Sequence, residues 1–278
     1  MAFWRLVDSG VCDAAFNMAL DEALSVSVRK ANSPTVMRLY AWEAPAISIG
    51  AFQKASDINL EYCTNNNIQI VRRPTGGRAI LHGDELTYSF SAKNDDQFAG
   101  GLMNAYRRIG EAFNLCFSMA GLKCLVRSTP EKGSNLSRSP LCFASSSLGE
   151  ISSNGMKIIG SAQKRWKDGF LQQGTIPFAT DHTILKAVFR KCFTKFESSA
   201  QSGLRELLPH FDVGNFKKLL ITAFEETFAV TLVDSQPSSA ELELAHQLAA
   251  EKYLEQIWTL EGKTDDQFCN NAKISQQV

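Results

Sequence analysis

The stretch Arg72-Arg73-Pro74-Thr75-Gly76-Gly77-Arg78-Ala79-Ile80-Leu81-His82 decides how the rest of this chain is interpreted. Alternating apolar residues precede it at 68–71 and follow it at 86–90, which is the pattern of two short strands. Its proline restricts the backbone, while its paired glycines can adopt positive φ and let another molecule approach their amides. Because three permanently charged arginines accompany those amides, the stretch predicts a loop that binds an anion or a polarised carbonyl.

The same residues leave a simpler interpretation open, because paired glycines between strands also make plain hairpins and nearby arginines are commonly solvated. Two nucleotide-binding motifs are excluded. The spacing is neither that of a Walker phosphate loop nor that of the dinucleotide G-x-G-x-x-G pattern.

Length and composition predict an ordinary globular protein. With 278 residues and 44% hydrophobic content, the chain can bury a core as one large domain or one domain with a small appendage. Its 29 basic and 29 acidic side chains balance, so there is no global charge for nucleic acid or an anionic membrane, and any anion recognition is local. We expect a cytoplasmic protein, because no apolar run is long enough to span a bilayer and no signal-peptide pattern is present.

Seven cysteines form an odd set without C-x-x-C spacing, at positions 12, 63, 116, 124, 142, 192 and 269. A chain of this size needs no disulfide framework. We therefore expect free thiols and no metal site.

The predicted elements alternate between strands and helices. Strands are expected at 3–7, 36–40, 46–50, 68–71, 86–90 and 170–177, and helices at 13–28, 58–66 and 102–120. The strands 36–40 and 46–50 are expected to form a hairpin. In the first helix, Asp13 is a plausible N-cap, and Asn17 and Asp21 fall on a more polar side where solvation is expected.

A second informative stretch begins at Cys142, at the exit of a polar loop over 128–140. It continues through the turn Ser153-Asn154-Gly155, whose chemistry predicts a hairpin, into an apolar strand that contains Lys157. Cys142 and Lys157 together suggest a nucleophile and a neighbouring cation. An inert cysteine and a solvent-facing lysine remain the alternatives on these residues alone.

Helical spacing dominates beyond residue 184, at 204–208, 216–228 and 240–258, and no catalytic pattern appears there. We expect an α+β fold, with a mixed or antiparallel sheet packed with helices. Its organisation is expected to be a single catalytic domain over 1–262, helical from about 184, followed by a polar tail at 263–278.

The chain resembles the lipoate-protein ligase and octanoyltransferase family, whose catalytic fold is shared with biotin protein ligases. The resemblance runs from about Trp4 to Gly262 and is strongest to the LipM-type octanoyltransferases. Three motifs carry it: 72–89 is similar to the acyl-binding loop, Pro140-Leu141-Cys142-Phe143 to the nucleophile segment, and 157–165 to the lysine strand.

This resemblance implies transfer of octanoyl from octanoyl-acyl carrier protein to a lysine of a lipoyl-domain protein, such as glycine cleavage H protein. It implies Cys142 as the acyl-thioester nucleophile and Lys157 as the residue that lowers its pKa, without ATP, another cofactor or a metal. The implied substrate-binding residues are Arg72, Arg73, Gly76, Gly77, Arg78, His82 and Gly160. His82 is a further candidate as a base for the incoming amine, and a monomer is expected.

Several alternatives stay open. An ATP-dependent lipoate ligase typically carries an Arg-Asn-Asp pattern where this chain has Ser139-Pro140-Leu141-Cys142. An amidotransferase between lipoyl proteins also uses a cysteine. A non-catalytic binder is disfavoured because both Cys142 and Lys157 are present, and a papain-like hydrolase because its signature is missing. Gln173 departs from the histidine common in the family, which puts fine substrate choice in doubt.

Overall fold

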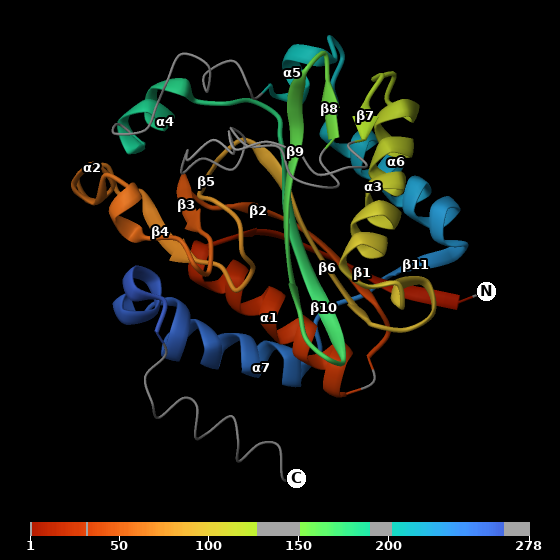
Figure 1. The fold of residues 1–278 in the computed structure, drawn as a ribbon, viewed down its shortest axis with the longest axis horizontal. Helices are drawn as coiled ribbons and strands as arrows, with labels where there is room; N and C mark the ends of the chain where they lie inside the picture. The colour runs from red at the N-terminus through yellow and green to blue at the C-terminus, as the bar shows by residue number, and fades with distance from the viewer. Residues whose placement is uncertain (1, 32, 127–150, 190–201, 264–278) are drawn as a thin grey trace.

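The computed structural model describes residues 2–31, 33–126, 151–189 and 202–263. Two sheets organise this part of the chain (Figure 1). The predicted α+β class, with mixed sheets packed by helices, is confirmed.

The larger sheet has eight strands in the order β11-β1-β2-β6-β10-β9-β8-β7. Its strands are β1 (Ala2–Cys12), β2 (Val36–Trp42), β6 (Glu85–Lys93), β7 (Leu125–Val126), β8 (Ile151–Ser153), β9 (Met156–Arg165), β10 (Gly169–Pro177) and β11 (Val230–Asp234). β1 runs parallel to β2 and β11, and the remaining pairs are antiparallel. The predicted turn between β8 and β9 is confirmed, with positive φ at Asn154 and Gly155.

The smaller sheet has the order β4-β3-β5 and carries the glycine-containing stretch at one end. Its strands are β3 (Ala46–Ile49), β4 (Gln69–Arg72) and β5 (Ile80–His82). β3 lies between the other two, parallel to β4 and antiparallel to β5. The loop at 73–79 therefore crosses over β3, which excludes a plain two-stranded hairpin.

Helices cover both faces of the larger sheet (Figure 1). The helices are α1 (Ala14–Lys30), α2 (Leu60–Asn65), α3 (Gly101–Met119), α4 (His182–Val188), α5 (Leu204–Leu207), α6 (Val213–Phe228) and α7 (Ser239–Leu248), followed by π-helical turns at Ala249–Tyr253 and Ile257–Glu261. α3 and α6 enclose one aromatic-rich core, α1 and α7 enclose a second, and a third lies around the smaller sheet with α2 and α4. Asp13 caps α1 as predicted, accepting a hydrogen bond from the Phe16 amide at 2.9 Å.

One prediction was wrong. The strands at 36–40 and 46–50 do not form a hairpin, because β2 pairs with β1 and β6 in the larger sheet while β3 belongs to the smaller one. The portion beyond residue 184 contains helices and, in addition, one strand that was not predicted. β11 returns to pair with β1, with Val230 opposite Ala2, because its alternating buried residues need a sheet partner.

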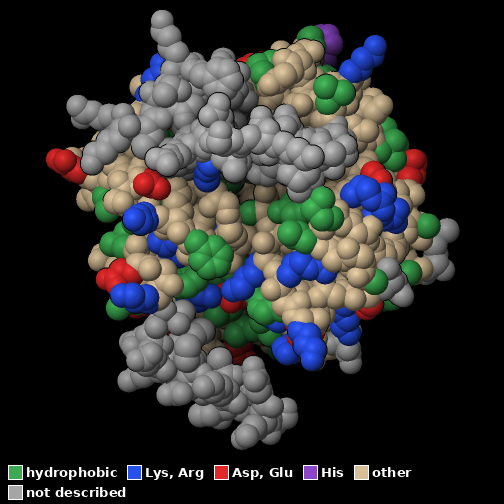
Figure 2. All heavy atoms as spheres, viewed as in Figure 1, with side chains coloured by type: hydrophobic (Ala, Val, Ile, Leu, Met, Phe, Trp, Pro, Cys, Tyr) green, Lys and Arg blue, Asp and Glu red, His purple; other side chains and the backbone are tan. Residues whose placement is uncertain are grey.

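Basic and hydrophobic side chains are intermingled on the surface. Figure 2 shows Lys and Arg side chains spread over the middle of one face, with hydrophobic side chains between them, although the formal net charge is zero. Among the described residues, no helix combines the length and apolarity that crossing a membrane requires.

Candidate active site

Arg72 lies at the end of β4 and holds two distant segments together. Its buried guanidinium makes six hydrogen bonds, all to main-chain carbonyls: those of Gly50, Ala51, Gln53, Trp258, Thr259 and Leu260, at 2.8–3.2 Å. The indole nitrogen of Trp258 donates a hydrogen bond to the Arg72 carbonyl at 2.9 Å. These bonds give the guanidinium of Arg72 a structural role, and substrate binding by Arg72 stays a prediction.

Arg73 shapes the glycine loop from inside. Its Nη2 donates to the carbonyls of Gly76 at 2.8 Å and Arg78 at 2.7 Å. Its Nη1 donates to the carbonyl and the hydroxyl of Ser48, at 2.9 and 3.1 Å. The buried guanidinium thus fixes the loop against β3 and leaves the backbone of Gly77 exposed.

Glycine is required at two positions, Gly77 and Gly50, where other atoms of the protein lie too close for a side chain. Gly77 has φ +86°, and a Cβ there would lie 2.9 Å from Nη2 of Arg73. A Cβ on Gly50 would lie only 2.0 Å from the Gly77 carbonyl oxygen. A Cβ on Gly76, by contrast, would meet no atom of the described residues within 4 Å other than those of its chain neighbours, so this side of the loop is open among them.

His82 is held by contacts on three sides. Its ring stacks on Trp42 with centroids 3.9 Å apart, Nδ1 lies 2.7 Å from Glu85 Oε1, and Nε2 lies 2.7 Å from Ser48 Oγ. An ionised carboxylate only accepts, so Nδ1 of the ring donates to Glu85, while either atom of the Nε2–Ser48 Oγ contact can be the donor. A base oriented by a carboxylate is the arrangement that proton transfer requires.

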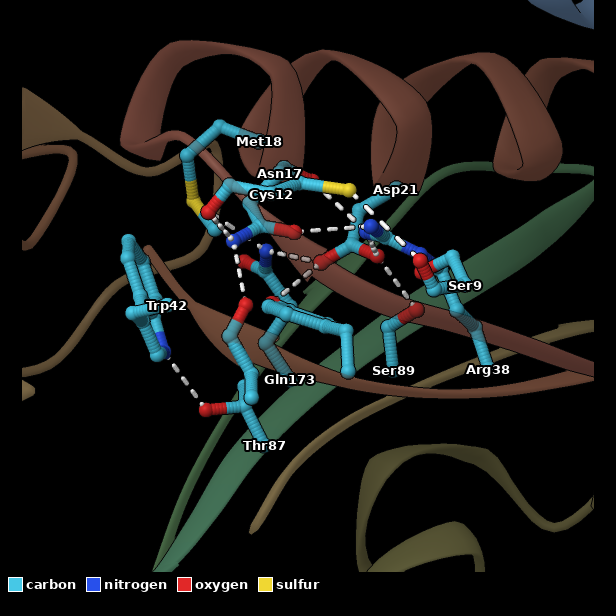
Figure 3. A network of polar contacts seen from close by, with 12 residues as sticks. Ser9, Cys12, Asn17, Met18, Asp21, Arg38, Trp42, Thr87, Ser89 and Gln173 are labelled. Atoms are coloured by element: carbon cyan, nitrogen blue, oxygen red, sulfur yellow. Dashed lines mark hydrogen bonds and ion pairs between the residues drawn. The ribbon is translucent and has the colours of Figure 1, made fainter. Parts of the chain in front are cut away.

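A second polar network, centred on Asp21, was not predicted. Asn17 and Asp21 have no solvent exposure, so the expectation that they are solvated was wrong. Asp21 accepts from Arg38 Nη1 at 2.7 Å, and Arg38 also donates to the Asn17 side chain at 2.8 Å (Figure 3). Covered by the sheet on one side and by α7 on the other, α1 has no solvated face at these positions.

The Asp21 network reaches the glycine loop through Gln173. The Gln173 amide donates to Asp21 Oδ2 at 2.7 Å and accepts from Thr75 Oγ1 at 2.8 Å. Thr75 belongs to the glycine loop, so a side chain of β10 ties that loop to α1. Gln173, which stands where the family commonly has histidine, therefore lies inside the candidate site.

A narrow cavity of about 20 Å³ lies between the two sheets, behind the glycine loop. Its lining residues are Met18, Tyr40, Trp42, Ser48, Arg73, Ile80, His82, Thr87, Ser161, Ala162, Gln173 and Gly174. We call it the inner slot.

A larger, open cavity of about 570 Å³ adjoins the inner slot, and His82 borders both. Glu85 and Pro177, which pair with each other at the end of β6 and β10, line this outer cavity. The two cavities therefore follow β10 in succession, with the imidazole of His82 at their junction.

Lys157 lies near the same end of the sheet as the outer cavity. It is buried in β9 and pairs with Ser152. Gly160, three residues further along, pairs with Thr175 of β10, so Lys157 lies toward the Pro177 end of that strand. Cys142, the predicted nucleophile, lies outside the described residues.

The described part of the chain contains no cluster of potential metal-binding side chains, and Cys12, Cys63, Cys116 and Cys124 are free thiols. Sequence reasoning missed the contributions of Ser48, Trp42 and Asp21. The available signal was weak. A buried aspartate on a helix, a serine in a short strand and a tryptophan at a strand end are each more often structural.

Residues 13–225 match the family model of the lipoyl protein ligase A/B catalytic domain. The chain belongs to this family. The chain is similar to proteins named octanoyltransferase LipM from Lysinibacillus sphaericus, with 36% identity covering 93% of this chain and 99% of the relative, and from Moorella thermoacetica, with 35% identity covering 92% and 97%. The LipM of Bacillus subtilis is 34% identical, again covering 92% and 97%.

Solved structures agree on the fold of this family. A bipartite lipoate protein ligase from Thermoplasma acidophilum superimposes with a TM-score of 0.79 at 23% identity, covering 96% of this chain and 99% of that one. A lipoate-protein ligase A bound with ATP gives 0.77 at 22% identity, covering 94% and 99%. The predicted ligase-like catalytic fold is therefore confirmed.

Proposed function

We propose that this chain is an octanoyltransferase, which moves octanoyl from octanoyl-acyl carrier protein to a lysine of a lipoyl-domain protein through a thioester on Cys142. The observation that carries this proposal is the match to relatives named octanoyltransferase LipM, at 33–36% identity over nearly their full length. The presence of both Cys142 and Lys157 in the matching motifs supports it.

Two balanced steps make up the reaction. The Cys142 thiolate attacks the carrier thioester, forms a new thioester and releases the carrier thiolate, which takes up the proton that Cys142 lost. The acceptor amine then attacks the acyl-enzyme, forms an amide, and returns its proton to the Cys142 sulfur. Neither step needs ATP, since the first exchanges equivalent bonds and the second is downhill.

Lys157 is the proposed source of the reactive thiolate. An unperturbed thiol with a pKa of about 8.5 is only a few per cent ionised at neutral pH, and half-ionisation requires about 2 kcal/mol. An ammonium about 4 Å away supplies an interaction of that order near a protein surface. One lysine beside Cys142 is therefore sufficient.

The inner slot is proposed to hold the acyl chain, with Gly76, Gly77, Arg78 and Gly160 beside it and Arg73 supporting the loop. Amide groups of the exposed glycine backbone are proposed to orient the acyl carbonyl and stabilise its oxyanion. His82, bordering both cavities, is proposed to take part in deprotonating the acceptor amine that enters from the outer cavity.

We infer that the protein is a monomer located in the cytoplasm.

The decisive experiment is the intact mass of the protein after incubation with octanoyl-acyl carrier protein without ATP. The wild type is expected to gain one octanoyl group that hydroxylamine removes and that a lipoyl domain accepts, whereas Cys142→Ala gains nothing. If modification of the lipoyl domain instead needs ATP and free octanoate, the protein is a ligase. The fold shared with a ligase bound to ATP makes this second candidate worth testing.

A further inference from the structure

Glu85, the first residue of β6, has one carboxylate oxygen that is fully engaged and one that is open. Its Oε1 accepts from His82 Nδ1 at 2.7 Å, from Trp42 Nε1 at 3.1 Å and from Thr87 Oγ1. Trp42 also donates to Thr87 Oγ1 at 2.8 Å (Figure 3), which holds this hydroxyl in place. Every hydrogen bond from the described residues to Glu85 falls on Oε1. Because only 6% of Glu85 is exposed, an oxygen without a partner on this side chain needs an explanation.

The open oxygen, Oε2, is directed into the outer cavity. It is not among the polar side-chain atoms that the described residues enclose without a partner, so it is in contact with solvent. The outer cavity has Glu85 in its lining, whereas the inner slot does not. A side chain that is otherwise buried therefore presents one free acceptor to this cavity.

His82 has no open nitrogen to offer in the same place. Its Nδ1 donates to Glu85, and its Nε2 lies 2.7 Å from Ser48 Oγ, which Arg73 holds at 3.1 Å. Trp42 covers one face of the ring, with centroids 3.9 Å apart. The imidazole thus orients the Glu85 carboxylate, and Oε2 is the acceptor that a ligand can reach.

The outer cavity suits a long side chain that ends in a cation. Its described lining contains carboxylates and apolar side chains but no lysine or arginine. Its volume of about 570 Å³ falls within the range of roughly 300–1,000 Å³ that is typical of ligand sites. The apolar side chains in its lining are those of Pro45, Leu81, Pro177, Ala179, Ile184 and Leu185. Such walls accommodate the methylene groups of a lysine, whose ammonium then meets a carboxylate.

The other titratable groups in the lining are His82, Asp84, Asp181 and His182. Asp84 is bound to Arg205 at 3.1 Å, and exposed Asp181 caps α4 through the amides of residues 183 and 184. Among the described carboxylates of the cavity, Glu85 therefore combines burial with an open oxygen. A cation that enters is attracted most strongly where water is most excluded.

Glu85 also lies at the end of the sheet that carries Lys157. It pairs with Pro177, the last residue of β10, and Lys157 lies toward the same end of that strand. The open carboxylate oxygen and the proposed activator of Cys142 therefore belong to one end of the larger sheet.

We propose that Glu85 is the catalytic residue that binds the ammonium of the acceptor lysine in the outer cavity and removes its proton. This inference rests on the proposed function, because it takes a lysine as the acceptor. The ammonium loses two protons during the transfer. One moves to Oε2 and from there to water, and the neutral amine then forms the amide bond as the carbon–sulfur bond of the thioester breaks. The second proton goes to the departing Cys142 sulfur.

The test separates the two transfers with Glu85→Gln, which keeps the shape of the side chain but not its charge. Acyl-enzyme formation from octanoyl-acyl carrier protein, followed by intact mass, is expected within about twofold of wild type. Transfer from the isolated acyl-enzyme to an apo lipoyl domain is expected to slow at least about a hundredfold at pH 7, as loss of a general base does. Hydroxylamine, which is neutral at this pH, should release octanoyl from both acyl-enzymes at equal rates.

The matched control is Glu241→Gln, because Glu241 is equally buried but binds Arg5 and lines neither cavity. Both of its transfers should proceed at wild-type rates at pH 7. The pH dependence gives a second readout. Without the carboxylate, only lysine that is already neutral can react, and this fraction rises about tenfold per pH unit below a pKa of about 10.4. Transfer by Glu85→Gln should therefore rise nearly tenfold per unit from pH 7 to pH 9, and wild-type transfer should rise less.

The proposal is overturned if folded Glu85→Gln passes octanoyl to the lipoyl domain at the wild-type rate, or if it slows both transfers equally. A structure of the wild type with the apo lipoyl domain decides the matter without a variant. The lysine Nζ should lie within hydrogen-bond distance of Glu85 Oε2, and a position elsewhere overturns the proposal as well. Failure of the proposed function is a different outcome, since the wild type then forms no acyl-enzyme in the first stage.

Discussion

Asp21 and Arg38 form an ion pair in which neither side chain has any solvent exposure, with Oδ1 and Nη1 2.7 Å apart. Both partners make further hydrogen bonds, to Tyr40 and Ser89 on one side and to Ser9 and Asn17 on the other. The pair joins α1 to β2 and, through Gln173, to the glycine loop.

We expect Asp21→Ala to lower the free energy of unfolding by about 3–5 kcal/mol, because it leaves the Arg38 charge buried without its partner. Urea unfolding followed by circular dichroism measures this loss. The control is Asp168→Ala, which removes partly exposed pairs with Arg29 and Lys30 and is expected to cost under about 1 kcal/mol. Equal losses in the two variants would contradict a special role for the buried pair.

Gly76→Ala is expected to fold normally and to lose activity. Apart from its two chain neighbours, no described residue lies within 4 Å of the added Cβ and φ is not positive, so the melting temperature should stay within about 2 °C of wild type. If the open side of Gly76 faces the acyl group, the rate of acyl-enzyme formation should fall at least about tenfold, which is about 1.4 kcal/mol. Gly83→Ala, which is equally open, is the control for both measurements. Unchanged kinetics in Gly76→Ala would remove Gly76 from the proposed site.

Gly50→Ala, in contrast to Gly76→Ala, is expected to destabilise the protein, because its Cβ would lie 2.0 Å from the Gly77 carbonyl oxygen. The loop must move, so we expect both a lower melting temperature and a lower rate. Thermal unfolding and octanoyl transfer together distinguish this variant from Gly76→Ala, whose defect is confined to transfer.

Arg72→Ala is expected to loosen two segments that are far apart in sequence. Removing six hydrogen bonds leaves buried carbonyls in 50–53 and 258–260 without their donor, at a cost of about 3 kcal/mol or more. Hydrogen exchange should accelerate in both segments together. Arg107→Ala, on the exposed face of α3, should change neither, and faster exchange in one segment alone would refute the coupling.

Stability at acid pH should depend on Glu241. Burial raises the pKa of this carboxyl, but hydrogen bonds from Arg5 and from the Ser238 amide outweigh it and hold the pKa at about 2. A depressed folded-state pKa stabilises the protein above the unfolded pKa of about 4.3 and loses that contribution as the pH falls toward 2. The stability difference between wild type and Glu241→Gln should therefore shrink by about 2 kcal/mol between pH 5 and pH 2. A difference that is independent of pH would contradict this assignment.

Lys157→Met tests the proposed activation of Cys142. Removing the ammonium should raise the pH midpoint for alkylation of Cys142 by at least about one unit and slow acyl-enzyme formation at pH 7 about tenfold. Lys164→Met, on the same strand, is the control. An unchanged alkylation profile would mean that Lys157 does not act on the thiol.

The sequence predicted most elements correctly because their signals are local. The spacing of apolar residues gave α1 and α3, the Asn154-Gly155 turn gave the β8–β9 hairpin, and the motifs around the glycine loop gave the family. These features depend on neighbouring residues, whose geometry is set by the backbone itself. The Cys142 prediction stays a prediction from sequence.

Only the tertiary structure decided which strands share a sheet and which polar side chains are buried. β2 and β3 are close in sequence but belong to different sheets, and β11 finds its partner at the other end of the chain. Asp21 was expected to be solvated, and Arg72 was expected to face substrate. Asp21 is instead enclosed by Arg38, Ser89 and Gln173 from three strands of the larger sheet. The guanidinium of Arg72 is bound by carbonyls of 258–260, more than 180 residues away. The burial of a residue depends on the segments that pack against it. The local sequence therefore specifies the helix that carries Asp21, but it does not specify that the Asp21 carboxylate is buried away from water and held by charge-assisted hydrogen bonds.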